Sequence, residues 1–299
     1  MKKRCGICLA ILMLLVSAFA FAEETAPEWD FGVPLSELYS NRSLLVNRDH
    51  LLDKSYVPED LVTAGVKCTI SPKPKLCAEV NTALVKLFDA ASKVTTYTYR
   101  VQNSKGDWSE KTFESESGLK LILESGYRSY GTQATSFANY LARNNGVDDG
   151  TRSPAGASEH QSGMCADVLS VQYNNNNEYM NESFYQTPEA QWMEANCARY
   201  GFIIRYPADK ADVTKVPYEP WHLRYVGRYI AGYIHVNGLS LEEFTDRWQA
   251  AVEAFKAAGG DVEEQIALEA VQKSQAMESE VLDELGDDGD AEVSLTLSF

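Results

Sequence analysis

Two short segments place two of the chain's four histidines beside acidic residues, and each segment adjoins an apolar stretch. Residues 158–167 read SEHQSGMCAD, and Asp167 begins the apolar run that continues through residue 171. Residues 219–222 read EPWH and precede LRYV. A histidine at the end of a loop and an aspartate on the following strand can converge on one point. We therefore expect a fold that brings these two distant segments together.

Together the segments supply two imidazoles, from His160 and His222, and two carboxylates, from Asp167 and Glu219. A catalytic zinc ion takes three protein ligands and keeps one position for water. Two histidines and one carboxylate fill that shell, which leaves the second carboxylate free to act as a general base. From spacing alone, ordinary surface or core histidines remain the competing interpretation. There is no HExxH motif, so the helix-borne zinc geometry is excluded.

The spacing of apolar residues predicts both helices and short strands. Helices are predicted over residues 77–91, 133–144, 188–200 and 240–257. Short strands are predicted at residues 44–46, 119–123, 166–171, 202–205 and 222–226. Because these strands do not alternate regularly with helices, we expect an α+β fold with a small antiparallel sheet and flanking helices.

The two ends of the chain differ from its middle. Residues 1–22 have a basic start, an apolar run and small residues before Ala22, as in a signal peptide cleaved after Ala22. An uncleaved membrane anchor is the alternative. We expect one domain over residues 23–245 and an acidic extension over residues 246–299, either a packed helix or a partly disordered tail.

The net charge of −16 restricts the partners. A strongly acidic protein repels nucleic acid and anionic membrane surfaces, so neither is an expected partner. No second hydrophobic stretch follows the first, so we expect no stable membrane insertion after removal of the signal. The sequence gives no indication of the oligomeric state.

Of the six cysteines, Cys5 and Cys8 lie in the predicted signal peptide. The remaining even number is compatible with disulfides in an exported protein. The candidate pairs are Cys68 with Cys77, which flank a proline-containing loop, and Cys165 with Cys197. The alternative is buried free thiols, which pack as small hydrophobic groups.

Four blocks, in order, resemble the VanY-type D-alanyl-D-alanine carboxypeptidase family. They are SGYRSY at residues 125–130 with Gln133, SxHxxGxxxD at residues 158–167, YGFIIRYP at residues 200–207, and EPWHLRYVG at residues 219–227. The resemblance covers residues from about 44 to 244. It implies a hedgehog/DD-peptidase-like fold, a zinc carboxypeptidase domain over residues 23–245, and one Zn²⁺ per chain.

The resemblance also implies residue roles. The matched zinc ligands are His160, Asp167 and His222, and the matched catalytic base is Glu219. Arg128 matches the residue that binds the substrate carbonyl and its developing oxyanion, although a structural ion pair is the alternative. Gln133 and Ser158 match positions that line the substrate pocket.

One position departs from the family. Cys165 stands where the family usually has alanine. Its thiolate could bind zinc, but we expect its side chain to face away from Asp167.

The function that the resemblance implies is zinc-dependent removal of the terminal D-alanine from peptidoglycan stem peptides. The protein would act in the periplasm or outside the cell, in association with the cell wall. An L,D-carboxypeptidase or an endopeptidase on wall peptides is the first alternative, because pocket shape decides between them. A zinc-containing module that binds wall peptides without cutting them is the second. The presence of Glu219 argues against it, since binding alone needs no general base.

Overall fold

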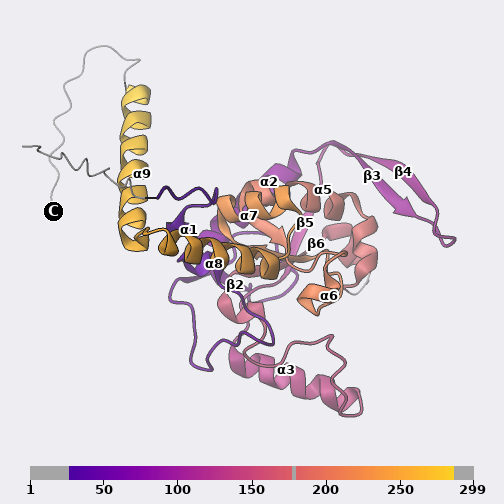
Figure 1. Ribbon diagram of the computed structural model, residues 1–299. Coiled ribbons are helices and arrows are strands. Elements are labelled where there is room, and N and C mark those ends of the chain that lie inside the picture. Colours follow the sequence, from indigo (N-terminus) through magenta and orange to yellow (C-terminus); the bar gives the residue numbers. More distant parts are fainter. Residues whose placement is uncertain (1–26, 177–179, 286–299) are drawn as a thin grey trace, which may run out of the picture.

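The computed structural model describes residues 27–176 and 180–285 (Figure 1). Four short antiparallel strands form its central sheet. Their order across the sheet is β5 (Leu121–Ser125), β6 (Cys165–Ser170), β8 (His222–Tyr225) and β7 (Phe202–Ile204). The predicted α+β class with a small antiparallel sheet is therefore confirmed. No strand forms at residues 44–46, and the carbonyl of Leu44 accepts a hydrogen bond from the Arg224 side chain.

The main core lies between this sheet and helix α2 (Ala78–Ser92), with helix α5 (Pro188–Asn196) and the 3-10 turn η4 (Cys197–Tyr200) beside it. The predicted helix over residues 188–200 is thus divided in two, and Gly201 ends it in the left-handed conformation at φ 85°. Helix α2 buries one apolar face, which includes Val80, Leu84 and Leu87. Helix α3 (Tyr130–Arg143) buries only Gln133, and it lies at the edge of the molecule (Figure 1).

A second core joins the start of the described chain to its later helices. It contains residues of α1 (Leu35–Leu38), α7 (Gly227–Asn237) and α8 (Leu241–Ala257). Ser240 and Glu243 form a capping box at the start of α8, which stops the chain fraying there. Helix α8 continues past residue 245, and Phe255 near its end is still buried, so the packed region includes all of this helix.

The acidic extension continues as helix α9 (Val262–Leu285). The Glu269 carboxylate accepts hydrogen bonds from the backbone N–H groups of Leu35 (2.8 Å) and Ser36 (2.9 Å) at the start of α1. The described part of this extension is helical and contacts α1 through Glu269, but residues 270–277 are exposed, so the helix is not packed along its length. The predicted signal peptide at residues 1–22 and the last residues, 286–299, lie outside the described part of the chain. No helix within the described part is long and apolar enough to cross a membrane.

Two further pairs of strands lie outside the central sheet. Strands β1 (Leu61–Thr63) and β2 (Lys75–Cys77) pair near the start of α2. Strands β3 (Thr96–Gln102) and β4 (Trp108–Glu114) form a hairpin that projects from the body (Figure 1). This hairpin was not predicted, although Tyr97, Tyr99 and Val101 alternate with polar residues as in a strand with one covered face.

Neither predicted disulfide forms. The thiols of Cys68, Cys77, Cys165 and Cys197 are all free. The Cys68 thiol donates to the carbonyl of Val66, whereas the Cys77 thiol lies 3.6 Å from the carbonyl oxygen of Ser162. Cys197 is buried in the main core. Three of the four free thiols are buried, as the alternative of buried free cysteines predicts. The fourth, that of Cys68, is half-buried.

The two faces of α2 generate a stability prediction. Leu84→Ala removes a fully buried side chain and should lower the free energy of unfolding by about 2–5 kcal/mol. The adjacent Val85 is 40% exposed, so Val85→Ala is the matched control and should change stability by less than about 0.5 kcal/mol. Urea unfolding followed by circular dichroism measures both. Equal losses in the two variants would contradict the helix orientation.

Candidate functional site

The central sheet brings the two histidine segments together. Asp167 on β6 and His222 on β8 are direct cross-strand partners, so their side chains leave the same face of the sheet. Asp167 Oδ1 lies 3.1 Å from His222 Nδ1, and Asp167 Oδ2 lies 3.2 Å from His160 Nε2. All three residues are buried. The three residues predicted to form a metal site thus converge on one point.

His160 is positioned by the short 3-10 turn η2 (Glu159–Ser162). Its Nδ1 lies 2.6 Å from the carbonyl oxygen of Gly126, which can only accept, so Nδ1 carries the proton and Nε2 is left facing Asp167. Gly163 ends the turn at φ 70°, and a Cβ there would lie 2.8 Å from the Cys77 sulfur. Glycine is therefore required at this position to turn the chain from His160 into β6.

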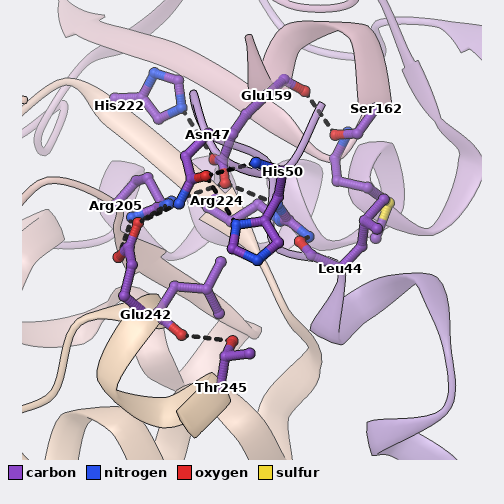
Figure 2. Close-up of polar contacts among 12 residues, drawn as sticks. Leu44, Asn47, His50, Glu159, Ser162, Arg205, His222, Arg224, Glu242 and Thr245 are labelled. Carbon is purple, nitrogen blue, oxygen red and sulfur yellow. Dashed lines mark hydrogen bonds and ion pairs between the residues drawn. The ribbon is translucent and has the colours of Figure 1, made fainter. Parts of the chain in front are cut away.

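A buried ionic network supports the other histidine (Figure 2). The Glu159 carboxylate accepts hydrogen bonds from Arg205 (2.7 Å) and Arg224 (2.8 Å), and all three side chains are fully buried. Its second oxygen, Oε2, lies 3.4 Å from His222 Nε2. The nitrogen of His222 that faces Asp167 is Nδ1, and the Glu159 carboxylate lies behind the ring.

Charges inside the cluster shift its pKa values. Burial opposes ionisation of His160, but the negative charges of Cys165 and Asp167 outweigh it and raise the pKa of His160 to about 9. Burial likewise opposes ionisation of Asp167, but the adjacent His160 and His222 hold the pKa of this carboxyl well below its usual range. In the absence of a metal ion, protons on the imidazoles therefore balance the negative charge of the site.

Glu219 lies at the open side of the cluster. Its Oε2 is 3.6 Å from His222 Nδ1, and the backbone N–H of His222 donates to the Glu219 carbonyl, so the two residues share one turn. Burial raises the pKa of Glu219 above its ordinary value, although the charge of His222 opposes this. A carboxylate with a raised pKa takes up a proton more readily, which suits a general base.

The remaining predicted residues line the same pocket, whose volume is about 660 Å³. Arg128 follows β5, and its backbone N–H donates to the carbonyl of His160. Gln133 donates through Nε2 to the Ser153 carbonyl (2.5 Å), while its buried Oε1 has no hydrogen-bond partner among the described residues. Ser158 lines the pocket directly before η2. Arg128 forms no ion pair within the described part of the chain, so the alternative of a structural pair receives no support.

The expectation for Cys165 is wrong. Residues two apart on a strand share a face, so Cys165 and Asp167 point the same way from β6. Ligand atoms of His160, Cys165 and His222 lie within 4.8 Å of one another. Burial opposes ionisation of this thiol, but the two imidazoles lower its pKa. The thiol therefore belongs to the cluster.

Several residues of the site carried no predicted role. Arg205 and Arg224 enter the resemblance only as parts of longer motifs, and Glu159 stands at a position that the motif leaves open. The sequence did contain a signal, because Arg205 and Arg224 each lie in or next to an apolar strand segment. A buried arginine requires a carboxylate partner, which is here Glu159. Arg152 and Tyr218, which also line the pocket, lie in loops without any recognisable spacing.

The atoms at the centre fit a metal ion by their chemistry. Two imidazole nitrogens and a carboxylate are the donors of a catalytic zinc site with an open position. Separations of 3.1–3.2 Å between these donors suit neighbouring ligands of an ion that binds N and O at about 2.0–2.2 Å. Carbonyl and carboxylate groups behind the rings complete the arrangement typical of metal-binding histidines.

Comparison with known proteins identifies the family of this chain. The family model of VanY D-alanyl-D-alanine carboxypeptidases matches residues 111–228. The chain is 36% identical to YodJ of Bacillus subtilis over 208 residues. This aligned region covers 68% of this chain and 66% of YodJ. The chain is 38% identical over 126 residues to a D-alanyl-D-alanine carboxypeptidase of Enterococcus faecium, which covers 42% of this chain and 36% of that protein. The chain thus spans less than two thirds of the length of these curated relatives.

A solved structure gives the same result for the fold. The LdcB LD-carboxypeptidase, whose structure reveals the molecular basis of peptidoglycan recognition, superposes with a TM-score of 0.56 at 36% identity. The match covers 68% of this chain and 84% of that structure, so the predicted peptidase fold is confirmed. The chain belongs to the VanY family of D-alanyl-D-alanine carboxypeptidases.

Proposed function

We propose that this chain is an exported zinc metallocarboxypeptidase that removes the terminal D-alanine from peptidoglycan stem peptides. The observation that carries the proposal is the convergence of His160, Asp167 and His222, with Glu219 3.6 Å from His222 Nδ1. Membership of the VanY family supports this choice of reaction. The signal-like residues 1–22 support export to the periplasm or cell exterior.

His160, Asp167 and His222 would hold the zinc ion. A zinc ion bound there would supply a Lewis acid that polarises the scissile carbonyl and makes water acidic enough to attack near neutral pH. Glu219 is placed to take the proton from the attacking water and to return it to the leaving amine, because one carboxylate can serve as base and then as acid.

Arg128 has a different task. It lines the pocket as a cation without an ion pair in the described chain, so its charge is available to the substrate. A fixed positive charge lowers the barrier where negative charge develops on the attacked carbonyl. Arg152 lines the same pocket. Two cations in the pocket of a protein with net charge −16 suit a substrate that ends in a carboxylate.

A second candidate is L,D-carboxypeptidase activity on tetrapeptide stems. The likeness to the LdcB LD-carboxypeptidase over 84% of that structure favours it. Both reactions use the same groups at the metal centre and differ in the stereochemistry of the residue before the scissile bond.

The proposed role of Glu219 as the base leads to a prediction about catalysis. Glu219→Gln keeps the shape of the side chain but cannot accept the proton, so D-alanine release should fall by roughly 10²–10⁴-fold. Glu116→Gln, at an exposed loop position, is the matched control and should leave the rate unchanged. Coupled detection of D-alanine released from pentapeptide measures both. Full activity in Glu219→Gln, or after chelation of the protein, would refute a metal-dependent peptidase, and tight stem-peptide binding without turnover would favour a binding module.

Metal binding should depend on pH. The pKa of His160 in the metal-free protein is raised to about 9, so below that pH a proton competes for the same nitrogen. Affinity for zinc should therefore rise as the pH increases from about 6 to about 8, and binding should release protons. Calorimetric titration in buffers of different ionisation enthalpy measures the release. Zinc binding with no proton release across this range would contradict the arrangement.

Substrate choice separates the two reactions. Pentapeptide ending in D-Ala-D-Ala and tetrapeptide ending in a single D-alanine are offered in parallel, and the products are identified by mass spectrometry. Conversion of pentapeptide to tetrapeptide supports the D,D assignment. Conversion of tetrapeptide to tripeptide, with pentapeptide left intact, would replace it with the L,D assignment.

A further inference from the structure

Side chains of residues 186 and 191 hold the projecting hairpin in place. Backbone N–H and C=O of Arg100 on β3 exchange hydrogen bonds with the Gln191 side chain of α5, at 2.9 and 2.6 Å. The backbone N–H of Gln102 donates to Gln186 Oε1 (3.0 Å). Amide side chains thus hold the edge strand as a neighbouring strand would. A surface that is held in place before binding loses little freedom when a ligand binds.

Three aromatic rings lead from the pocket to this hairpin. Tyr218 lines the pocket. Its ring centre is 5.8 Å from that of Tyr185, in the 3-10 turn η3 (Glu182–Gln186), and the Tyr185 ring is 6.3 Å from Trp108 on β4. Both ring pairs are edge-to-face. The rings therefore form a continuous aromatic track from the reaction site to the hairpin.

The outer end of this track remains accessible. Trp108 is 43% exposed, although Arg100 lies over its ring at 5.1 Å and Tyr185 meets it edge-on. Tryptophan side chains normally bury much of their large apolar surface. Met180, also exposed, lines the pocket beside the start of η3. Apolar surface thus continues from the pocket wall outward instead of ending at its rim.

We propose that the aromatic track, formed by Trp108, Tyr185 and Tyr218, binds the sugar rings of the glycan strand to which a stem peptide is attached. This proposal rests on the proposed function. A stem peptide with its terminal residue in the pocket continues to a sugar strand, which must leave past the pocket rim. Sugar rings present apolar C–H faces that stack on aromatic rings, and polar edges that accept and donate hydrogen bonds. Arg100 and Gln102, beside Trp108 on the same face of the hairpin, supply polar groups for those edges.

The test compares two substrates with the same peptide, one free and one attached to its disaccharide. The wild-type chain should show a lower KM for the disaccharide-peptide. Trp108→Ala should raise that KM by roughly five- to tenfold, as expected for loss of one aromatic contact, without changing kcat or the KM for the free peptide. Tyr229→Ala is the matched control, because Tyr229 is 59% exposed on α7, away from the track, and should change neither KM.

A direct binding measurement keeps the test independent of catalysis. Peptide-free glycan oligomers are titrated into the intact chain by calorimetry, with thermal unfolding used to verify that Trp108→Ala is folded. Binding that the substitution abolishes supports the track. Equal KM values for the two substrates in the wild type, or glycan binding unaffected by Trp108→Ala, would overturn it. Failure of the wild type to cleave either peptide would refute the proposed function, while the glycan titration still decides the track.

Discussion

The buried carboxylate of Glu159 is the group on which the rest of the site depends. It is surrounded by two buried guanidinium groups, from Arg205 and Arg224, and by the ring of His222. Removing one member of such a group costs about 3–5 kcal/mol because an unpaired charge stays buried. Burial opposes its ionisation, but the two arginines hold the pKa of Glu159 far below its usual range. A negative charge is thereby kept permanently behind His222.

The same network joins parts of the chain that are distant in sequence. Arg205 also bonds twice to Glu242 in the first turn of α8, at 2.9 and 2.7 Å, and Arg224 donates to the Leu44 carbonyl (2.7 Å). One set of charges therefore sets the position of the second core, the N-terminal segment and the η2 turn relative to the sheet. Strand pairing and this network position Asp167 and His222, whereas Arg128 and Glu219 lie in loops.

The sequence predicted the elements that contain long apolar patterns, and it failed where partners lie far apart. Helix α2 was found because it has one apolar face, and strand β6 because it contains a short run of buried apolar residues. Motif resemblance singled out His160, Asp167, His222 and Glu219, since spacing alone left them one interpretation among two, and the structure brings the four side chains together. The hairpin β3–β4 is held by Gln186 and Gln191, whose role has no local signal. The thiols stay unpaired, because cysteine number gives no information on where the chain brings them.

The contact at the start of helix α1 determines when this part of the chain can finish folding. The first N–H groups of α1 have no partner within the helix, as at every helix start. Here the acceptor is Glu269, which is separated from Leu35 by 234 positions along the chain. During synthesis these donors stay hydrated until nearly the whole described chain exists. The start of the described region can thus reach its final state only after the chain has been made as far as Glu269.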